Sequence, residues 1–408
     1  MIKGILYIFL SMCSFCIAAQ TPMLSNQGAL FSVKGNAFVS VHGDSRNDNT
    51  GTFHNSNEMH LFGDWENNAS NEAFVSIGEG VVHMQGDTQH IRGSSITRFY
   101  DLRMENTGVK YGDIDVYVDG FLNLNDREFN LDTNTTHVFN TDLASVQHNQ
   151  SAGIWGFVSS LGNGGLLRHT DTTSAYFFPV GSTQGTPRFR PVNISPDTST
   201  AAAFKVRFAN VDATAEGWDR SLSSFKVCAI NPHFFHRISQ TAGTQSAVIE
   251  MFFDVALDGN FSDMGKWVNS NMWDEASTAT ASVNATYSLD TRTSIQSISD
   301  FSPNAFALTR LSPDVILTVD PVPICSDQFT ILTANTVDSS SFNSYDFFVD
   351  NILVHSGNSN SFVLNNPNVG ILPVWVEGTM SGCGSGSDTV MLTVLEAVVA
   401  NAYSDTII

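Results

Sequence analysis

Short alternating segments that end in glycine recur through the first third of the chain. Each has apolar residues at positions i and i+2 and a glycine at i+4, and the copies are Val39/Val41/Gly43, Met59/Leu61/Gly63, Val82/Met84/Gly86 and Val116/Val118/Gly120. The glycines lie 20, 23 and 34 residues apart. A period of two that stops at glycine is typical of a short strand followed by a tight corner. Recurrence at these intervals predicts stacked coils, each too small to bury its own apolar face.

This pattern predicts a β-solenoid over residues 20–165. Further strand-like segments, at residues 99–102 and 121–124, lie between corners rich in Asn, Gly and Asp. With coils about 4.8 Å apart, about five coils would form a stub of roughly 25 Å. The spacing alone is also compatible with a β-sandwich. We favour a parallel β-helix because the intervals resemble coil lengths rather than hairpins.

The pattern changes after residue 165, and residues 166–311 predict an antiparallel β-sandwich. Aromatic-rich segments open this region, and alternating segments follow at residues 204–208, 225–228, 248–253 and 301–308. Several short strands at modest spacing, without a helical period, favour such a sandwich. The fold class that we expect is therefore all-β, with a further immunoglobulin-like β-sandwich over residues 312–396.

Two cysteines flank this last region. Cys325 opens one strand and Cys383 lies 58 residues later, near the end of the domain. In an exported all-β module this separation predicts a disulfide between the two sheets. Closing the loop would stabilise the module by about 4 kcal/mol in the chain-entropy treatment. The prediction leaves Cys228 as a free thiol, which we expect to be a buried core residue.

The N-terminus predicts export. Lys3 precedes an apolar run over residues 4–17, and small residues follow at Ala18 and Ala19, so residues 1–19 are expected to be a cleaved signal peptide. No later apolar run approaches the roughly 18 residues that span a bilayer. We therefore expect a secreted protein, associated with the cell surface, without a transmembrane segment after signal removal.

Composition narrows the class of partner. Charged residues make up only 14 % of the 408 residues, and the formal net charge is −21. Such a negative field repels nucleic acid and anionic membranes, and it favours solubility and divalent cations. Nucleic acid is therefore excluded as a partner, whereas surface glycans and cell-envelope proteins remain candidates.

Three stretches resemble a known family of proteins. The solenoid segment contains HMQGDTQHIRGSSITRFYDLRMENTGVKYGDIDVYVDGFLNL, the next region contains YFFPVGS, RFRPV and KWVNSNMWDE, and the last contains YDFFVDNILVHSGNSNSF and VWVEGTMSGC. In this order they resemble large secreted cell-surface proteins of gliding bacteria that use type IX secretion. The resemblance implies a non-catalytic role in adhesion or motility, with a solenoid, a sandwich and immunoglobulin-like or PKD-like repeats.

The end of the chain carries a further expectation. Residues 397–408 include the phrase VVANAYSDTII, which resembles the opening of another immunoglobulin-like repeat in that family. The family normally ends with a sorting domain, which this sequence does not contain. We therefore expect an N-terminal fragment of a longer protein, whose further repeat is truncated.

One acidic loop is a candidate calcium site. Asp254, Asp258, Asn260 and Asp263 crowd a glycine-containing loop, and oxygen ligands of this kind suit calcium. The spacing is not that of an EF-hand, and surface loops commonly carry such residues. Asp44, Asp64 and Asp87 follow the first three corner glycines and could stack along the rod, although turn formation explains them better.

Other motifs that suggest chemistry have ordinary structural explanations. His233 and His236 form an H-x-x-H without the third ligand that zinc requires. Ser223 and Lys226 match S-x-x-K by letters, but that motif needs a helix to bring the two side chains to one face. Four tryptophans could form a sugar-stacking platform, although a buried core is the commoner use; these are Trp218, Trp267, Trp273 and Trp375.

The sequence therefore favours a non-catalytic surface protein without a cofactor, calcium excepted. Two alternatives stay open: an extracellular polysaccharide-binding module that uses aromatic residues, and a solenoid polysaccharide lyase or hydrolase. Sugar cleavage needs two positioned carboxylates, or a cation and a base beside a carboxylate. Acidic residues are abundant throughout the chain, so their presence does not decide between these classes.

Overall fold

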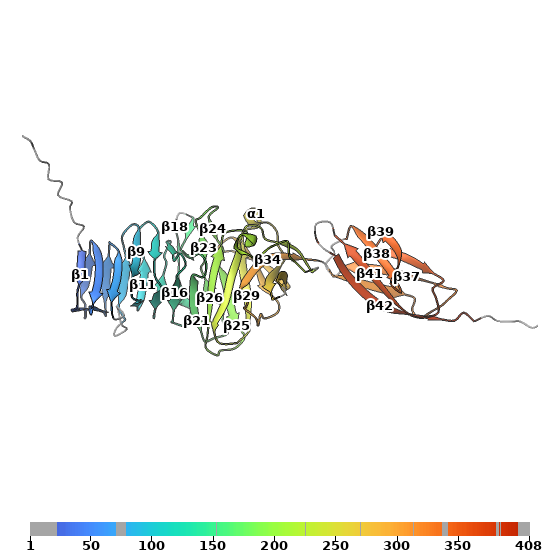
Figure 1. Cartoon of the computed structure of the whole chain (residues 1–408), viewed down its shortest axis with the longest axis horizontal. Coiled ribbons are helices and arrows are strands. Elements are labelled where there is room, and N and C mark those ends of the chain that lie inside the picture. Colours follow the sequence, from blue (N-terminus) through green and yellow to red (C-terminus); the bar gives the residue numbers. More distant parts are fainter. Residues whose placement is uncertain are drawn as a thin grey trace, which may run out of the picture.

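The computed structural model describes residues 23–70, 79–151, 153–224, 226–269, 271–312, 314–336, 342–380, 383 and 385–398. The expected signal peptide and nearly all of the expected further repeat lie outside these residues. The chain is all-β, as predicted. Its three parts follow one another along the long axis, as a solenoid, a sandwich and an immunoglobulin-like module (Figure 1).

The solenoid is a parallel β-helix of about six turns with three faces. The first face is β1 (Met23–Asn26), β4 (Asp44–Asn49), β7 (Trp65–Ala69), β9 (Gln89–Gly93), β12 (Lys110–Gly112), β15 (Glu128–Asn130) and β20 (Phe157–Ser159). The second face begins with β2 (Leu30–Val33) and β5 (Thr52–Asn55), and its later turns hold β10 (Thr97–Phe99), β13 (Val116–Val118), β16 (Thr135–Val138) and β21 (Gly165–Thr170). The third face is β3 (Phe38–Val41), β6 (Glu58–Leu61), β8 (Val81–Met84), β11 (Asp101–Met104), β14 (Leu122–Asn123) and β17 (Val146–Gln147).

The glycine-terminated segments fall on two of these faces. The first three copies are β3, β6 and β8, which pair in register, so that Val39, Met59 and Val82 lie above one another. The fourth copy is β13, which belongs to the second face. The third face continues instead through Leu102 and Leu122, at steps of 20 residues. The 34-residue interval therefore joins two different faces, and the chain makes about one turn more than expected.

Buried amide ladders connect successive turns. Nδ2 of Asn26 donates to Oδ1 of Asn47 at 3.1 Å, and Nδ2 of Asn47 donates to Oδ1 of Asn67 at 3.1 Å. Nδ2 of Asn67 then donates to the carbonyl of Ile96 at 2.7 Å. All three asparagines are buried. An amide can donate and accept along one line, so identical positions in stacked coils satisfy each other without water.

The solenoid passes into the sandwich without a break. Strand β21 pairs in parallel with β16 on one side and antiparallel with β26 (Ala202–Ala209) on the other. The same sheet continues through β28 (Phe235–Ala242), β34 (Ala305–Leu311), β30 (Asp263–Val268) and β31 (Met272–Ser277), and β27 (Val227–Ile230) also pairs with β34. The expected boundary at residue 165 therefore lies at the start of a strand that both regions share.

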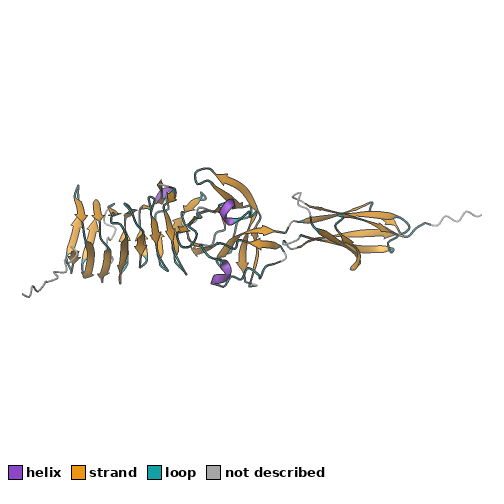
Figure 2. Ribbon diagram, turned by 90° about the horizontal axis from the view of Figure 1, so that it is seen from above, coloured by secondary structure: helices purple, strands orange, loops and turns teal. Residues whose placement is uncertain are grey.

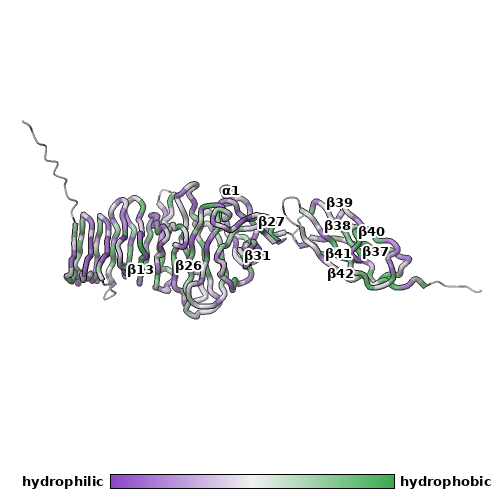
Figure 3. The backbone as a smooth tube through the Cα atoms, in the orientation of Figure 1, coloured by the Kyte–Doolittle hydropathy of each residue, from purple (hydrophilic) through white to green (hydrophobic). Residues whose placement is uncertain are grey.

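A second sheet completes the sandwich. It contains β22 (Tyr176–Phe178), β25 (Val192–Pro196), β29 (Ala247–Phe253), β33 (Leu289–Ser294) and β32 (Ala279–Asn284), all antiparallel. One apolar cluster runs from Phe53 in the solenoid to Leu308 in the sandwich. Short helices lie at its edges: α1 (Val255–Asp258) and the 3-10 turns Leu143–Ser145 and Ala213–Glu216 (Figure 2). Solenoid strands mix apolar and polar residues, as expected for alternating side chains (Figure 3).

The last module is a two-sheet sandwich with its own core. One sheet is β35 (Val315–Asp320), β37 (Phe329–Thr336) and β40 (Ser361–Asn365). The other is β36 (Ile324–Cys325), β42 (Ser385–Leu395), β41 (Gly370–Thr379), β38 (Ser344–Val349) and β39 (Ile352–Gly357). The apolar residues between these sheets form a separate cluster. This arrangement fits the expected immunoglobulin-like domain.

The predicted disulfide between Cys325 and Cys383 is wrong. Cys383 pairs with Cys228 of the sandwich, and Cys325 is free. The reason lies in the long strand β42: Cys325 is beside its last residue, Leu395, whereas Cys383 precedes its first residue. The 11 residues of β42 span about 36 Å, far beyond the roughly 7 Å that a disulfide permits between Cα atoms. The disulfide therefore joins the last module to the sandwich.

Candidate functional sites

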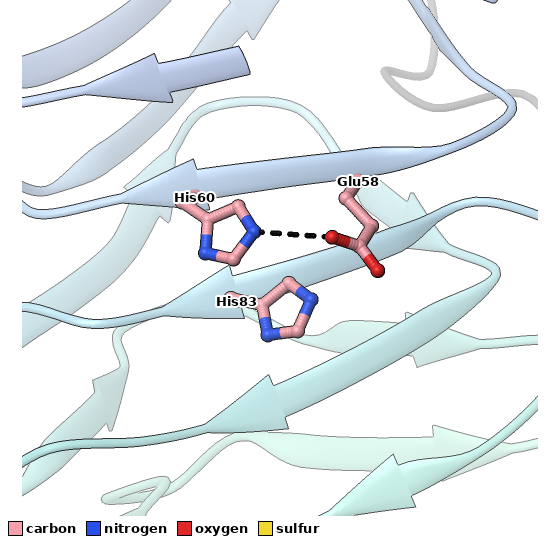
Figure 4. Close-up of side chains that lie close together, drawn as sticks. All are labelled: Glu58, His60 and His83. Atoms are coloured by element: carbon pink, nitrogen blue, oxygen red, sulfur yellow. Dashed lines mark ion pairs between the residues drawn. The ribbon is translucent and has the colours of Figure 1, made fainter. Parts of the chain in front are cut away.

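A histidine–carboxylate cluster lies on the outward side of the third solenoid face (Figure 4). Strands β6 and β8 are neighbours, and their pairing places His60 directly beside His83. The two imidazoles stack with centroids 4.1 Å apart and planes 4° from parallel. Glu58 lies on the same strand as His60, and its Oε2 is 3.5 Å from Nε2 of His60. Parallel pairing therefore brings three metal-ligating side chains together from positions 23 or more residues apart.

Hydrogen bonding fixes how His83 presents its ring. Nδ1 of His83 is 2.9 Å from Oε1 of Glu105, whose other oxygen accepts from Gln85 at 2.7 Å. Burial of Glu105 opposes its ionisation, but the hydrogen bonds from Gln85 and His83 outweigh this and lower its pKa. An ionised carboxylate only accepts, so Nδ1 of His83 carries the proton. Nε2 of His83 therefore holds a free lone pair; it is buried and has no hydrogen-bond partner.

The sequence analysis missed this cluster, although a signal was present. His60 lies between Met59 and Leu61, and His83 lies between Val82 and Met84, so each histidine occupies the middle position of a glycine-terminated segment. In a strand, the residue between two core residues points to the opposite face. Histidine at the same outward position of two stacked segments therefore predicts adjacent imidazoles.

An aromatic cluster lies where the solenoid meets the sandwich. Tyr287 stacks on Phe177 with ring centroids 5.3 Å apart, and Trp155 packs edge-on against Tyr287 at 4.8 Å. His148 and Phe189 complete the group, and all five side chains are half-buried. Burial lowers the pKa of His148 to about 4 and raises the pKa of Tyr287 to about 12. The cluster is therefore uncharged at neutral pH and presents partly exposed ring surfaces.

The residues of the predicted calcium loop have other partners. Asp258 is buried and accepts from Nε of Arg188 at 2.9 Å and Nε of Arg190 at 2.5 Å. Asp254 caps helix α1 by accepting from the backbone of Ala256. Asp263 accepts from the backbone of Ala279, and Asn260 is exposed. The two arginines already neutralise Asp258, and calcium binding at this loop stays a prediction.

The aspartates after the corner glycines connect successive turns. Oδ1 of Asp44 accepts from the backbone N–H of Asp64, and Oδ1 of Asp64 accepts from that of His90, both at 2.9 Å. Asp87 accepts from the hydroxyl of Thr107. These carboxylates therefore bind donors of the next coil, in agreement with a structural role at the corners.

The remaining sequence motifs separate in space. His236 is buried, and its Nε2 is 2.8 Å from the carbonyl of Arg190, whereas His233 is exposed. Ser223 lies in an isolated bridge with Trp273 rather than on a helix, and Nζ of Lys226 pairs with Glu275 at 3.3 Å. Three tryptophans, Trp218, Trp267 and Trp273, pack in one core cluster, while Trp375 stacks on Phe348 at 3.6 Å.

A cavity of about 450 Å³ opens on the sandwich near the start of the last module. It is lined by charges of both signs, including Lys226, Asp263, Glu275, Arg292 and Asp314. Two carboxylates beside a cation are a minimal set for polysaccharide chemistry. Lys226 and Glu275 are already paired with each other, so the cavity offers a place to test the enzyme alternative.

Comparisons with known proteins add no relative. The chain matches no family model, no curated protein and no solved structure. Within the described residues, none of the helices has the length and apolar character needed to cross a bilayer.

Proposed function

We propose that this chain is a non-catalytic structural and adhesion protein of the cell surface. The observation that carries the proposal is mechanical continuity: one sheet and one core run from the solenoid into the sandwich, and a disulfide joins the sandwich to the last module. Backbone ladders that run through successive coils resist separation along the whole stack. A protein with this construction is suited to holding a binding surface away from its anchor.

Chemistry of the chain supports a location outside the cell. A disulfide persists in oxidising surroundings and is rare in the cytosol. The net charge of −21 favours solubility in the absence of other protein. Secretion itself rests on the N-terminal pattern of residues 1–19, and an association with type IX export or gliding motility rests on the resemblance alone.

Binding of polysaccharide is the second candidate function, and the aromatic cluster favours it. Trp155, Phe177 and Tyr287 expose ring faces at one place, which is the arrangement that sugar rings stack on. Under this alternative the chain would hold surface glycans directly, with no chemical step.

An adhesion assay combined with a glycan array separates these functions. Beads coated with the purified full chain are tested on cell-envelope and polysaccharide surfaces, and each soluble glycan is also assayed for cleavage. Retention on surfaces supports adhesion; retention that Trp155→Ala abolishes and Trp375→Ala preserves assigns it to glycans at the aromatic cluster. Turnover that Glu275→Gln abolishes would overturn the non-catalytic proposal, and so would retention no greater than that of uncoated beads.

A further inference from the structure

We propose that Glu58, His60 and His83 form a binding site for a divalent transition-metal ion of the zinc type. Their ligand atoms already lie within 4.8 Å of one another. Two imidazole nitrogens and one carboxylate oxygen are a donor set that zinc prefers, whereas calcium requires six or more oxygen ligands. Figure 4 shows both rings and the carboxylate facing one another.

Closing the site needs only small side-chain movements. Zinc bonds of about 2.0–2.1 Å place ligand atoms roughly 3.4 Å apart in a tetrahedron. The side chain of Glu58 is 53 % exposed, so it can rotate toward the imidazoles without disturbing the core. His60 is fixed in height by its pairing with His83, because both lie at matched positions on neighbouring strands.

An independent observation points to a ligand at the same place. His83 is only 6 % exposed, yet its Nε2 has no hydrogen-bond partner. An unsatisfied buried polar atom of this kind costs roughly 1–3 kcal/mol. The proton on Nδ1 is held by Glu105, which leaves the Nε2 lone pair directed at the cluster. A carboxylate behind a histidine in this way orients the ring and raises its basicity toward a metal.

Local charge also favours a cation. Glu58 and Glu105 contribute two carboxylates, and Arg103 is the cation that pairs in register with His83 on the next strand. Three protein ligands leave one tetrahedral position for water or for a donor group of another molecule. The ion would also bridge β6 and β8, which belong to successive turns, and would thereby stabilise the folded state by mass action.

Calorimetric titration of zinc into the purified full chain tests the proposal. The wild type should bind one equivalent more than His83→Ala, because loss of one ligand from three leaves too few donors. His90→Ala is the matched control: His90 also contacts a carboxylate, Asp113 at 2.8 Å, but lies on the first face. This variant should bind as many equivalents as the wild type. Equal stoichiometry in wild type and His83→Ala would overturn the site.

Two further variants protect the test against misfolding. Glu58→Gln changes an exposed side chain and should weaken zinc binding while circular dichroism stays unchanged. Glu105→Gln removes only the positioning carboxylate and should weaken binding by about 10–100-fold. If the folded Glu58→Gln and Glu105→Gln proteins both bind zinc as the wild type does, the assignment of these ligands is wrong. Calcium at equal concentration should produce no heat that depends on His83.

Discussion

At the residue scale, the most informative side chain is the buried ammonium of Lys110. It lies inside a corner of the solenoid and donates to the carbonyls of Gly86, Asp87 and Thr107 and to the side chain of Gln89. Burial lowers its pKa to about 8. Lysine is almost never fully buried unless it is paired. Here backbone carbonyls of two successive turns, rather than a carboxylate, satisfy its three protons.

Lys110→Met should therefore destabilise the solenoid although it removes a buried charge. Methionine fills the space, but it leaves the carbonyls of Gly86, Asp87 and Thr107 without this donor. We expect a loss of about 3 kcal/mol in the free energy of unfolding, measured by chemical denaturation. Lys34→Met, at an exposed position, should change it by less than about 0.5 kcal/mol. Equal midpoints for the two variants would contradict this role.

His236 makes stability depend on acidity. Burial lowers its pKa to about 4 in the folded chain, below the ordinary value of 6.5. Between these values the unfolded chain binds more protons, so stability falls as the pH falls from about 6.5 to about 4. The full contribution is about 3 kcal/mol.

Urea denaturation at pH 7 and pH 4.5 measures this effect. His236→Gln should show a smaller loss of stability between the two pH values than the wild type. His233→Gln, three residues away and exposed, should lose as much as the wild type. The buried His148 titrates in the same direction in all three proteins and therefore cancels. An unchanged pH dependence in His236→Gln would exclude this explanation.

At the scale of the element, the coil rather than the strand is the repeating unit. Individual strands are as short as two residues, for example β14 and β17, and could not be stable as isolated pairs. Stacking supplies the missing stability because identical side chains meet above and below. The ladder of Asn26, Asn47 and Asn67 is the clearest case, since each amide satisfies the next in a site without water.

Substitution within one strand tests this ladder. Asn67 is buried and Asn68 is half-exposed, although both belong to β7. Asn67→Ala leaves the amide of Asn47 and the carbonyl of Ile96 unpaired, so we expect a loss of about 2–3 kcal/mol by denaturant unfolding. Asn68→Ala removes only hydrogen bonds that water can replace and should cost less than about 1 kcal/mol. A ranking in the opposite order would show that the ladder contributes little.

At the scale of the whole molecule, the Cys228–Cys383 disulfide spans 155 residues and two cores. Closing a loop of this length stabilises by about 5 kcal/mol in the chain-entropy treatment. Neither core contains both sulfurs, so the bond restrains the junction between the modules rather than the packing within either of them.

Peptide mapping under non-reducing conditions tests this connection. A peptide that contains Cys228 should be recovered bound to one that contains Cys383, and Cys325 should be alkylated without prior reduction. Cys325→Ser should leave the linked pair intact, whereas Cys228→Ser should abolish it and free Cys383. Recovery of a linked Cys325–Cys383 pair would instead support the connection within a single module.

Local pattern determined much of this protein. The period of two with glycine corners predicted stacked parallel strands because core residues must alternate along a strand and meet in neighbouring coils. The same pattern predicted the register of Val39, Met59 and Val82. It also contained the position of the stacked histidines, because an outward residue between two core residues has a fixed direction.

Only the tertiary structure decided which distant residues meet. The step from Gly86 to Gly120 looked like another coil but crosses from one face to the next, because chain spacing does not record which face a strand occupies. The pairing of Cys383 with Cys228 depends on the length of β42 and on the placement of two modules. The orphaned Nε2 of His83 depends on Glu105, one coil away. These outcomes rest on contacts across many residues, and a one-dimensional pattern of apolar and polar positions does not contain them.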